Sequence, residues 1–155
     1  MILKEIIKKN KKLNSFFYKN LMTFRKYSIL RILQIEELKK QNIVGSILDV
    51  GGKETPNNTS NFLNAKIKYL DKYSKNENDL KIDLEKKFLE DEKNLEQFDN
   101  VLLMNVLEHI YDYKNCINIC YKLTKKNGRF IGSTPFFFRI HPSPNDYFRY
   151  TKEAL

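Results

Sequence analysis

The stretch Ser46-Ile47-Leu48-Asp49-Val50-Gly51-Gly52 decides the fold, because a short apolar run stops abruptly at two glycines. A run of this kind predicts a buried strand that ends in a tight turn. Similar short runs predict further strands over residues 67–70, 80–82, 101–104 and 129–134. Helix-prone segments separate them at residues 57–65, 84–97 and 112–126, the last of which Asn127-Gly128 is expected to close. Continuously apolar strands that alternate with helices predict an α/β fold, with a Rossmann-like, mostly parallel sheet and helices on both faces.

The composition fits one globular domain with a real core. The chain has 155 residues, of which 41% are hydrophobic and 30% charged, and this balance excludes disordered and fibrous classes. No apolar run approaches the roughly 20 residues that span a bilayer, and no secretory signal is recognisable, so we expect a cytoplasmic protein. Cys116 and Cys120 lie four apart in a helical stretch and are predicted to be reduced packing residues. Two thiols alone make a poor metal site, and no metal site is predicted.

The net charge of +9 is concentrated at the N-terminus. The first forty residues hold eleven basic and three acidic side chains, whereas the other 115 are close to neutral, which disfavours nucleic-acid binding. We therefore predict a basic helical extension over residues 1–42 and a main domain over residues 43–155. Two amphipathic helices with a break near Tyr27–Ser28 are expected to pack over the ligand-binding edge as a lid, through an apolar stripe of Phe16, Phe17, Leu21, Phe24, Leu30 and Leu33. The alternative is contact with an anionic membrane surface, for which the bases are Lys8, Lys9, Lys11 and Lys12.

Polar residues follow the predicted strands where the strands end. Gly51 and Gly52 follow the first strand, while Asp71, Asp83 and Asn105 end the next three. Carboxyl ends of parallel strands share one edge of a sheet, where ligands bind in this architecture. A glycine turn lets the backbone approach a ligand, Asp71 suits a ribose diol, and Asp83 suits an adenine amino group. Because the three-glycine dinucleotide fingerprint is missing, the edge favours a nucleoside with a short charged tail over a pyrophosphate.

Four motifs in order resemble the class I methyltransferases of type 11, which use S-adenosylmethionine (SAM). They are Ile-Leu-Asp-Val-Gly-Gly at 47–52, Phe-Asp-Asn-Val-Leu at 98–102 with Asn-Val-Leu-Glu-His-Ile at 105–110, Leu-Thr-Lys-Lys-Asn-Gly-Arg-Phe at 123–130, and Thr-Pro-Phe at 134–136 with His-Pro-Ser-Pro-Asn-Asp-Tyr-Phe-Arg-Tyr-Thr at 141–151. The last motif is similar to a subgroup associated with surface polysaccharide biosynthesis. The resemblance covers residues 44–155. The chain departs from it at Lys53, where a third glycine is usual, and in lacking the strands six and seven that the resemblance implies.

The resemblance implies SAM as cofactor and O-methylation of a sugar, glycan or sugar-linked small molecule. Lipids, small metabolites and protein side chains are alternative acceptors, and a non-catalytic or degenerate SAM-binding module is the alternative function. A second copy of the chain could cover the open edge of the sheet.

The site residues follow from the strand ends and from the same resemblance. Asp146 and Arg149 are expected to bind the acceptor, and an internal ion pair between them is the alternative. Glu108 is expected to orient a neighbour or cap a helix. The predicted residues are Asp49, Gly51, Gly52, Asp71, Asp83, Leu84 and Asn105 for SAM, His109 and His141 as general bases, and Asp146, Tyr147, Arg149 and Tyr150 for the acceptor.

Overall fold

The computed structural model describes residues 29–52, 62, 65–87, 96–142 and 144–155. The chain divides into two units, Met1–Asn42 and Ile43–Leu155, which are described separately. In the first unit, helix α2 spans Ile29–Lys39, beginning just after the predicted break at Tyr27–Ser28. Ile32 and Leu38 are its buried residues, whereas Leu33 is 47% exposed, so the prediction that Leu33 lies in a buried stripe is wrong. The other predicted stripe residues, and the four lysines at 8–12, lie outside the residues whose side chains are described.

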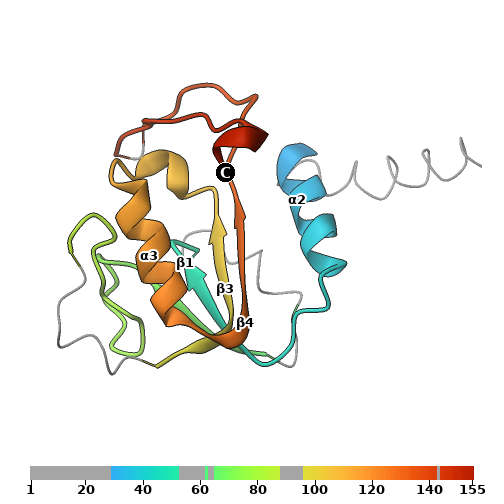
Figure 1. The fold of residues 1–155 in the computed structure, drawn as a ribbon, viewed down its shortest axis with the longest axis vertical. Helices are drawn as coiled ribbons and strands as arrows, with labels where there is room; N and C mark the ends of the chain where they lie inside the picture. Colours follow the sequence, from blue (N-terminus) through green and yellow to red (C-terminus); the bar gives the residue numbers. More distant parts are fainter. Residues whose placement is uncertain (1–28, 53–61, 63–64, 88–95, 143) are drawn as a thin grey trace, which may run out of the picture. The chain divides into compact units, whose positions relative to one another are not determined.

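A four-stranded parallel sheet forms the second unit (Figure 1). Its strands are β1 (Ser46–Val50), β2 (Lys66–Leu70), β3 (Phe98–Met104) and β4 (Thr124–Ser133), in the order β2-β1-β3-β4. Asp49 lies opposite Tyr69 on β2 and Leu102 on β3, so the three neighbouring strands end level with one another. The mostly parallel Rossmann-like sheet predicted from the sequence is therefore confirmed.

Helix α3 (Tyr113–Leu123) covers one face of this sheet (Figure 1). Successive strand residues point to opposite faces, and Leu48, Val50, Val101 and Leu103 form one core cluster with the buried face of α3. That helix face consists of Cys116, Ile119, Cys120 and Leu123. Both cysteines are free, buried and part of the core, as predicted. Most of each helix expected over residues 57–65 and 84–97 lies outside the described part of the chain; residues 84–87, which are described, form a turn and not a helix.

The end of α3 differs from the prediction. The helix begins after Asp112, whose side chain accepts a hydrogen bond from the Asn115 backbone N–H, but it ends at Leu123 instead of continuing to residue 126. Thr124 adopts an extended conformation, and its hydroxyl donates to the Cys120 carbonyl at 2.7 Å. This hydrogen bond satisfies a carbonyl of the last helical turn, so β4 can start at once. Asn127, with φ of 67°, then lies in an irregular part of β4, because the pairing jumps from Thr124 opposite Phe98 to Arg129 opposite Asn100.

The predicted third strand at residues 80–82 is also wrong. Only Leu80 pairs with the sheet, through a single parallel bridge to Leu70. A tight turn after β2 brings Leu80 back: its N–H donates to the Tyr69 carbonyl at 2.8 Å, and its carbonyl accepts from the Asp71 N–H at 3.0 Å. The side chain of Ser74 donates to Asp79 within that turn. Leu80 thus adds one residue to the sheet on the outer side of β2. It also brings Asp83 to the end of the sheet where the carboxyl ends of the strands lie.

Among the described residues after β4, the one regular element is the short helix η4 (Lys152–Ala154). Within the same part of the chain, β4 has β3 as its strand neighbour and no second one. None of the helices in the described residues combines the length and the apolar character that crossing a membrane requires.

Candidate functional site

The carboxyl ends of the strands bring the predicted polar residues to one edge of the sheet. Two hydrogen bonds bind neighbouring ends together: the Gly51 N–H donates to the Leu70 carbonyl at 2.9 Å, and the Asn105 N–H donates to the Ser133 carbonyl at 2.8 Å. The chain leaves β1 toward β2 on one side and later returns to β3 on the other side. The gap between the ends of β1 and β3 is therefore the topological switch point, where open parallel sheets bind their ligands.

Two residues in the left-handed region of backbone conformation flank this switch point. Gly51 has φ of 70° and Asn105 has φ of 58°, and each is the first residue after its strand. A Cβ added to Gly51 would lie 2.8 Å from a methyl of Val106. The position therefore requires glycine both for its backbone conformation and for lack of space. Asparagine is one of the few other residues that tolerate this conformation, and the Asn105 Oδ1 accepts from the Ser133 hydroxyl at 3.3 Å.

The Asp49 carboxylate is fully buried against the glycine turn. A Cβ at position 52 would lie 2.1 Å from the carboxyl atoms of Asp49, so only glycine permits this close approach. Asp49 therefore shapes the turn from beneath. The outer side of the turn is therefore formed by the backbone of Gly51 and Gly52.

Asp71 and Asp83 lie on the β2 side of the edge. Asp71 Oδ1 accepts a hydrogen bond from the Tyr73 N–H at 2.8 Å, which orients the carboxylate. Asp83 Oδ1 accepts from the Glu85 N–H at 3.1 Å and lies 3.5 Å from the Lys72 ammonium group. Lys72 is not among the residues predicted for this edge, although its place directly after Asp71 was a usable signal.

Leu84 is buried next to Asp83, and helix α3 fixes its position. The Asn115 side-chain amide donates to the Leu84 carbonyl and to the Lys86 carbonyl, both at 2.7 Å. Asn115 also completes the N-terminal cap of α3, so the helix start and the segment carrying Leu84 form one hydrogen-bonded unit.

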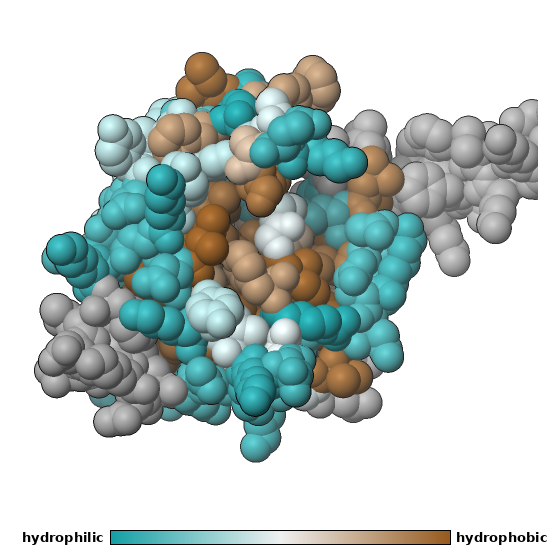
Figure 2. Space-filling view, in the orientation of Figure 1, coloured by the Kyte–Doolittle hydropathy of each residue, from teal (hydrophilic) through white to brown (hydrophobic). Residues whose placement is uncertain are grey.

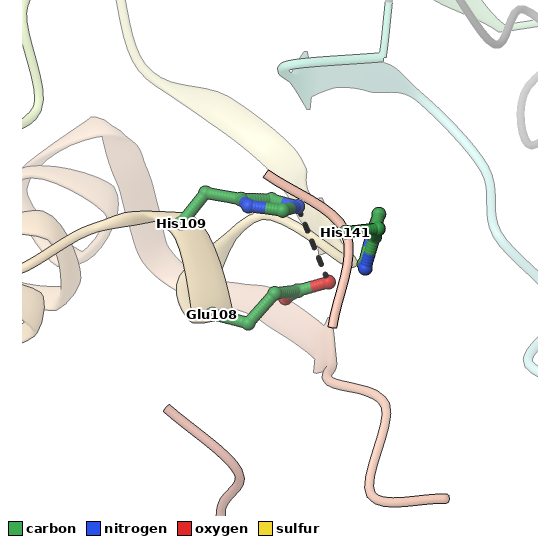
Figure 3. A group of neighbouring side chains, drawn as sticks. All are labelled: Glu108, His109 and His141. Carbon is green, nitrogen blue, oxygen red and sulfur yellow. Dashed lines mark ion pairs between the residues drawn. The ribbon is translucent and has the colours of Figure 1, made fainter. Parts of the chain in front are cut away.

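The two histidines, 32 positions apart in the sequence, come together with Glu108 (Figure 3). Glu108 and His109 lie in the short helix η3 (Leu107–His109) after β3, whereas His141 comes from the loop after β4. The imidazole centroids are 4.9 Å apart in an edge-to-face arrangement. His109 Nε2 lies 3.8 Å from Glu108 Oε1. Glu108 is 0% exposed, and burial raises the pKa of its carboxyl group.

The internal Asp146–Arg149 ion pair, the alternative to acceptor binding by these residues, is present. Arg149 holds both carboxylate oxygens of Asp146, with Nη2 to Oδ2 at 2.6 Å, and Asp146 also accepts from the His141 backbone N–H at 2.9 Å. The hydrogen bonds from Arg149, reinforced by that from the His141 N–H, hold the pKa of Asp146 well below its usual range. The pair therefore fixes the loop beside the histidines, and acceptor binding by these two residues stays a prediction.

The two predicted tyrosines occupy different surroundings. Tyr147 is 41% exposed, and its backbone N–H donates to the Glu108 carbonyl at 2.7 Å. Tyr150 packs against the core beside Tyr113 and Phe148, and burial raises the pKa of its hydroxyl to about 12. Tyr147 can thus present a flat face to a ligand, while Tyr150 serves packing. Phe137 and Ile140 are exposed on the loop between β4 and the ion pair. Figure 2 shows apolar surface at the top of the molecule, where Figure 1 draws this part of the chain.

Comparison with known proteins finds one matching family model and a similar solved structure. Residues 61–132 match the type 11 family model described as "Methyltransferase domain", which covers the edge from β2 to β4 and stops before the loop of His141. Among solved structures, the chain is similar to coclaurine N-methyltransferase bound to N-methylheliamine and SAH, with 17% identity and a TM-score of 0.46 over 66% of this chain. The chain spans about a third of the length of that structure, of which 35% is covered. No curated protein matches. The subgroup motif at 141–151 lies beyond the matched residues and stays a prediction.

Proposed function

We propose that this chain carries the cofactor-binding edge of a SAM-dependent methyltransferase. The parallel sheet is of the Rossmann-like methyltransferase kind, and the family match indicates SAM as the ligand of its edge. One observation supports the proposal most: Gly51 and Asn105, both in left-handed conformations, flank the switch point between β1 and β3. The acids suited to a nucleoside lie on the β2 side of that point.

The residues at successive strand ends suit successive parts of SAM. The glycine turn, shaped from beneath by Asp49, would receive the methionine end, and Asn105 would form the far wall. Asp71 would accept the ribose hydroxyl groups, since its Oδ1 is oriented by the Tyr73 N–H. Asp83 and the buried Leu84 would contact adenine. When bound, SAM supplies a sulfonium methyl group, which the acceptor would attack in line, with S-adenosylhomocysteine as the leaving group.

The acceptor is proposed to be a hydroxyl group of a sugar, a glycan or a sugar-linked small molecule. Displacement at a methyl group depends chiefly on alignment, and a hydroxyl nucleophile benefits from a group that takes or withdraws its proton. His109 and His141 are proposed to act on the acceptor oxygen through their Nε2 atoms, because their Nδ1 atoms contact backbone carbonyls. Exposed Tyr147, three residues before the partly buried Tyr150, offers a stacking face for a sugar ring.

Calorimetry with SAM and with S-adenosylhomocysteine tests the cofactor proposal. Asp71→Asn should weaken SAM binding by roughly tenfold or more, since a hydrogen bond to a charged group contributes about 1.5–3 kcal/mol. Glu77→Gln is the matched control, because this exposed acid lies in the same turn but away from the edge, and it should bind like the parent. A folded parent chain that binds neither ligand would refute the proposal.

Transfer of a labelled methyl group from SAM to nucleotide sugars and glycolipid extracts tests the acceptor. Labelled product should appear with a sugar-containing acceptor and decrease in His109→Gln and His141→Gln. Label on lipids, metabolites or proteins alone would overturn the proposed acceptor class and leave the cofactor site intact. SAM binding with no transfer to any acceptor would favour the non-catalytic module.

A further inference from the structure

We propose that Glu108, His109 and His141 form a binding site for a divalent transition-metal ion such as Zn²⁺ (Figure 3). Each residue offers one ligand atom, and the three atoms lie within 4.8 Å of one another. The Glu108 carboxylate points toward the two imidazoles, which approach it from different segments of the chain.

The first argument is the state of Glu108. Its side chain is fully buried, yet neither carboxylate oxygen has a hydrogen-bond partner among the described residues. A buried carboxylate without hydrogen bonds is costly, and native proteins pair such groups or use them to coordinate metals. His109 Nε2 at 3.8 Å is too far to donate a hydrogen bond. An ion between the carboxylate and the imidazoles would supply the contacts that Glu108 lacks.

The second argument is the orientation of both imidazoles. His109 Nδ1 contacts the Asn145 carbonyl, and His141 Nδ1 lies 3.2 Å from the Arg139 carbonyl and 3.3 Å from Asp146 Oδ2. An Nδ1–H that donates to an oxygen leaves the Nε2 lone pair available, which is the usual arrangement of metal-binding histidines. His109 thus directs its Nε2 toward Glu108 at 3.8 Å, and the contacts of His141 Nδ1 with a carbonyl and the Asp146 carboxylate leave its Nε2 free to bind the ion.

The third argument is that the loop carrying His141 is anchored to the turn carrying Glu108. Tyr147 N–H donates to the Glu108 carbonyl at 2.7 Å, and Asp146 is held by both Arg149 and the His141 N–H. Ligand atoms on one ion at about 2.0–2.2 Å lie roughly 3.0–3.5 Å apart. Closing the present spacing thus needs shifts of about 1 Å, which side-chain rotation supplies while the backbone stays in place.

Two nitrogens and one carboxylate suit Zn²⁺, Co²⁺, Fe²⁺ and Ni²⁺ better than Mg²⁺ or Ca²⁺, which prefer all-oxygen sites. Three protein ligands leave open positions of the kind that catalytic metal sites keep for a substrate. The ion would hold an oxygen of the methyl acceptor, and the histidines would act on that oxygen through the ion. This role of the ion rests on the proposed function.

Titration of the metal-free full chain with Co²⁺, followed by visible absorption, tests the site. One equivalent should bind with the spectrum of nitrogen and oxygen ligands, and Zn²⁺ should displace it. Glu108→Gln and His141→Asn should each lower Co²⁺ affinity by more than tenfold, and Asp146→Asn by about tenfold through the second shell. Glu153→Gln, an exposed acid on η4, is the control and should bind like the parent.

The cysteines provide an internal check on this titration. Thiolate coordination by Cys116 and Cys120 gives intense charge-transfer bands, which should be absent because both thiols are buried in the core. Failure to bind Co²⁺ in a folded chain, or affinity unchanged in both ligand variants, would overturn the proposal. SAM calorimetry on the metal-free chain separates the outcomes, because loss of the metal site leaves the edge at Gly51 and Asp71 untouched.

Discussion

Replacement of Gly51 by alanine tests the geometry on which the cofactor site depends. Gly51 has φ of 70°, a conformation that costs an L-residue about 1–2 kcal/mol. The added methyl group would lie 2.8 Å from Val106 Cγ2, roughly 1 Å closer than an ordinary carbon–carbon contact. Overpacking of this kind costs about 1–3 kcal/mol. We expect Gly51→Ala to lower the free energy of unfolding by about 2–5 kcal/mol.

A double-mutant cycle in urea separates the two contributions. Val106→Ala alone removes two methyl groups from a partly buried side chain and should cost about 1 kcal/mol. In Gly51→Ala/Val106→Ala the steric term disappears and the backbone term remains, so the double variant should be about 1–3 kcal/mol more stable than additivity predicts.

Gly132→Ala is the matched control for the cycle. A Cβ there would meet the Leu103 carbonyl at 3.6 Å and Phe130 at 3.9 Å, which are ordinary contacts. Its stability should change by less than about 1 kcal/mol. Additive costs in the cycle, or a Gly51→Ala variant as stable as the control, would show that the turn does not have the packing described.

Three further predictions concern charge, thiols and the adenine wall. Hydrogen bonds from Ser46, with Lys125, hold the pKa of Asp99 well below its ordinary 3.8, so this stabilisation is present above the unfolded-state pKa and lost as pH falls. The advantage of the parent over Asp99→Asn in urea midpoint should therefore be constant near neutrality and shrink below about pH 4; an advantage unchanged at pH 3 would contradict this. The buried thiols Cys116 and Cys120 should both resist Ellman's reagent in the native chain and react on unfolding, because their mutual hydrogen bond and burial raise the pKa of Cys120; rapid native reaction would count against the core described. Asn115→Ala removes the donor to the Leu84 and Lys86 carbonyls, which should cost about 1–3 kcal/mol in urea and weaken SAM binding in calorimetry; unchanged affinity would remove this segment from the cofactor site.

The strands of the sheet could be predicted where a short segment is so apolar that only the buried interior suits it. The run at 101–104 is continuously apolar and the run at 47–50 is apolar except for Asp49, and the structure buries all of their residues in β1 and β3. The segment at 124–128 was misassigned because its polar residues fit a helix end as well as a strand. Contacts with residues distant in the sequence decide between helix and strand here, because the irregular pairing opposite Phe98 and Asn100 places Thr124 in β4. The failure at residues 80–82 has a similar cause: a turn closed by Ser74 and Asp79 returns only Leu80 to the sheet.

The edge residues could be predicted because parallel strands end on one side of a sheet. The cluster of Glu108, His109 and His141 could not, because it depends on how the loop after β4 returns to the turn after β3. That return is set by the Tyr147 N–H bond to the Glu108 carbonyl and by the Asp146–Arg149 pair, neither of which has a periodic signature. The consecutive acid and histidine, with a second histidine in a proline-rich loop, were the one available signal.

The two halves of the site therefore rest on different physical grounds. The place of the cofactor follows from topology: β1 has β2 on one side and β3 on the other, and left-handed residues end both β1 and β3, so the gap between them opens at Gly51 and Asn105. Any sequence that keeps this strand order and these two turns keeps that gap. The proposed acceptor side depends on specific side-chain contacts in the loop after β4 and in η3. On these proposals, a change of acceptor or of metal requires substitutions in that loop or in η3, which carries Glu108 and His109, whereas loss of cofactor binding requires damage to the sheet edge or to the segments that support it, such as Asn115.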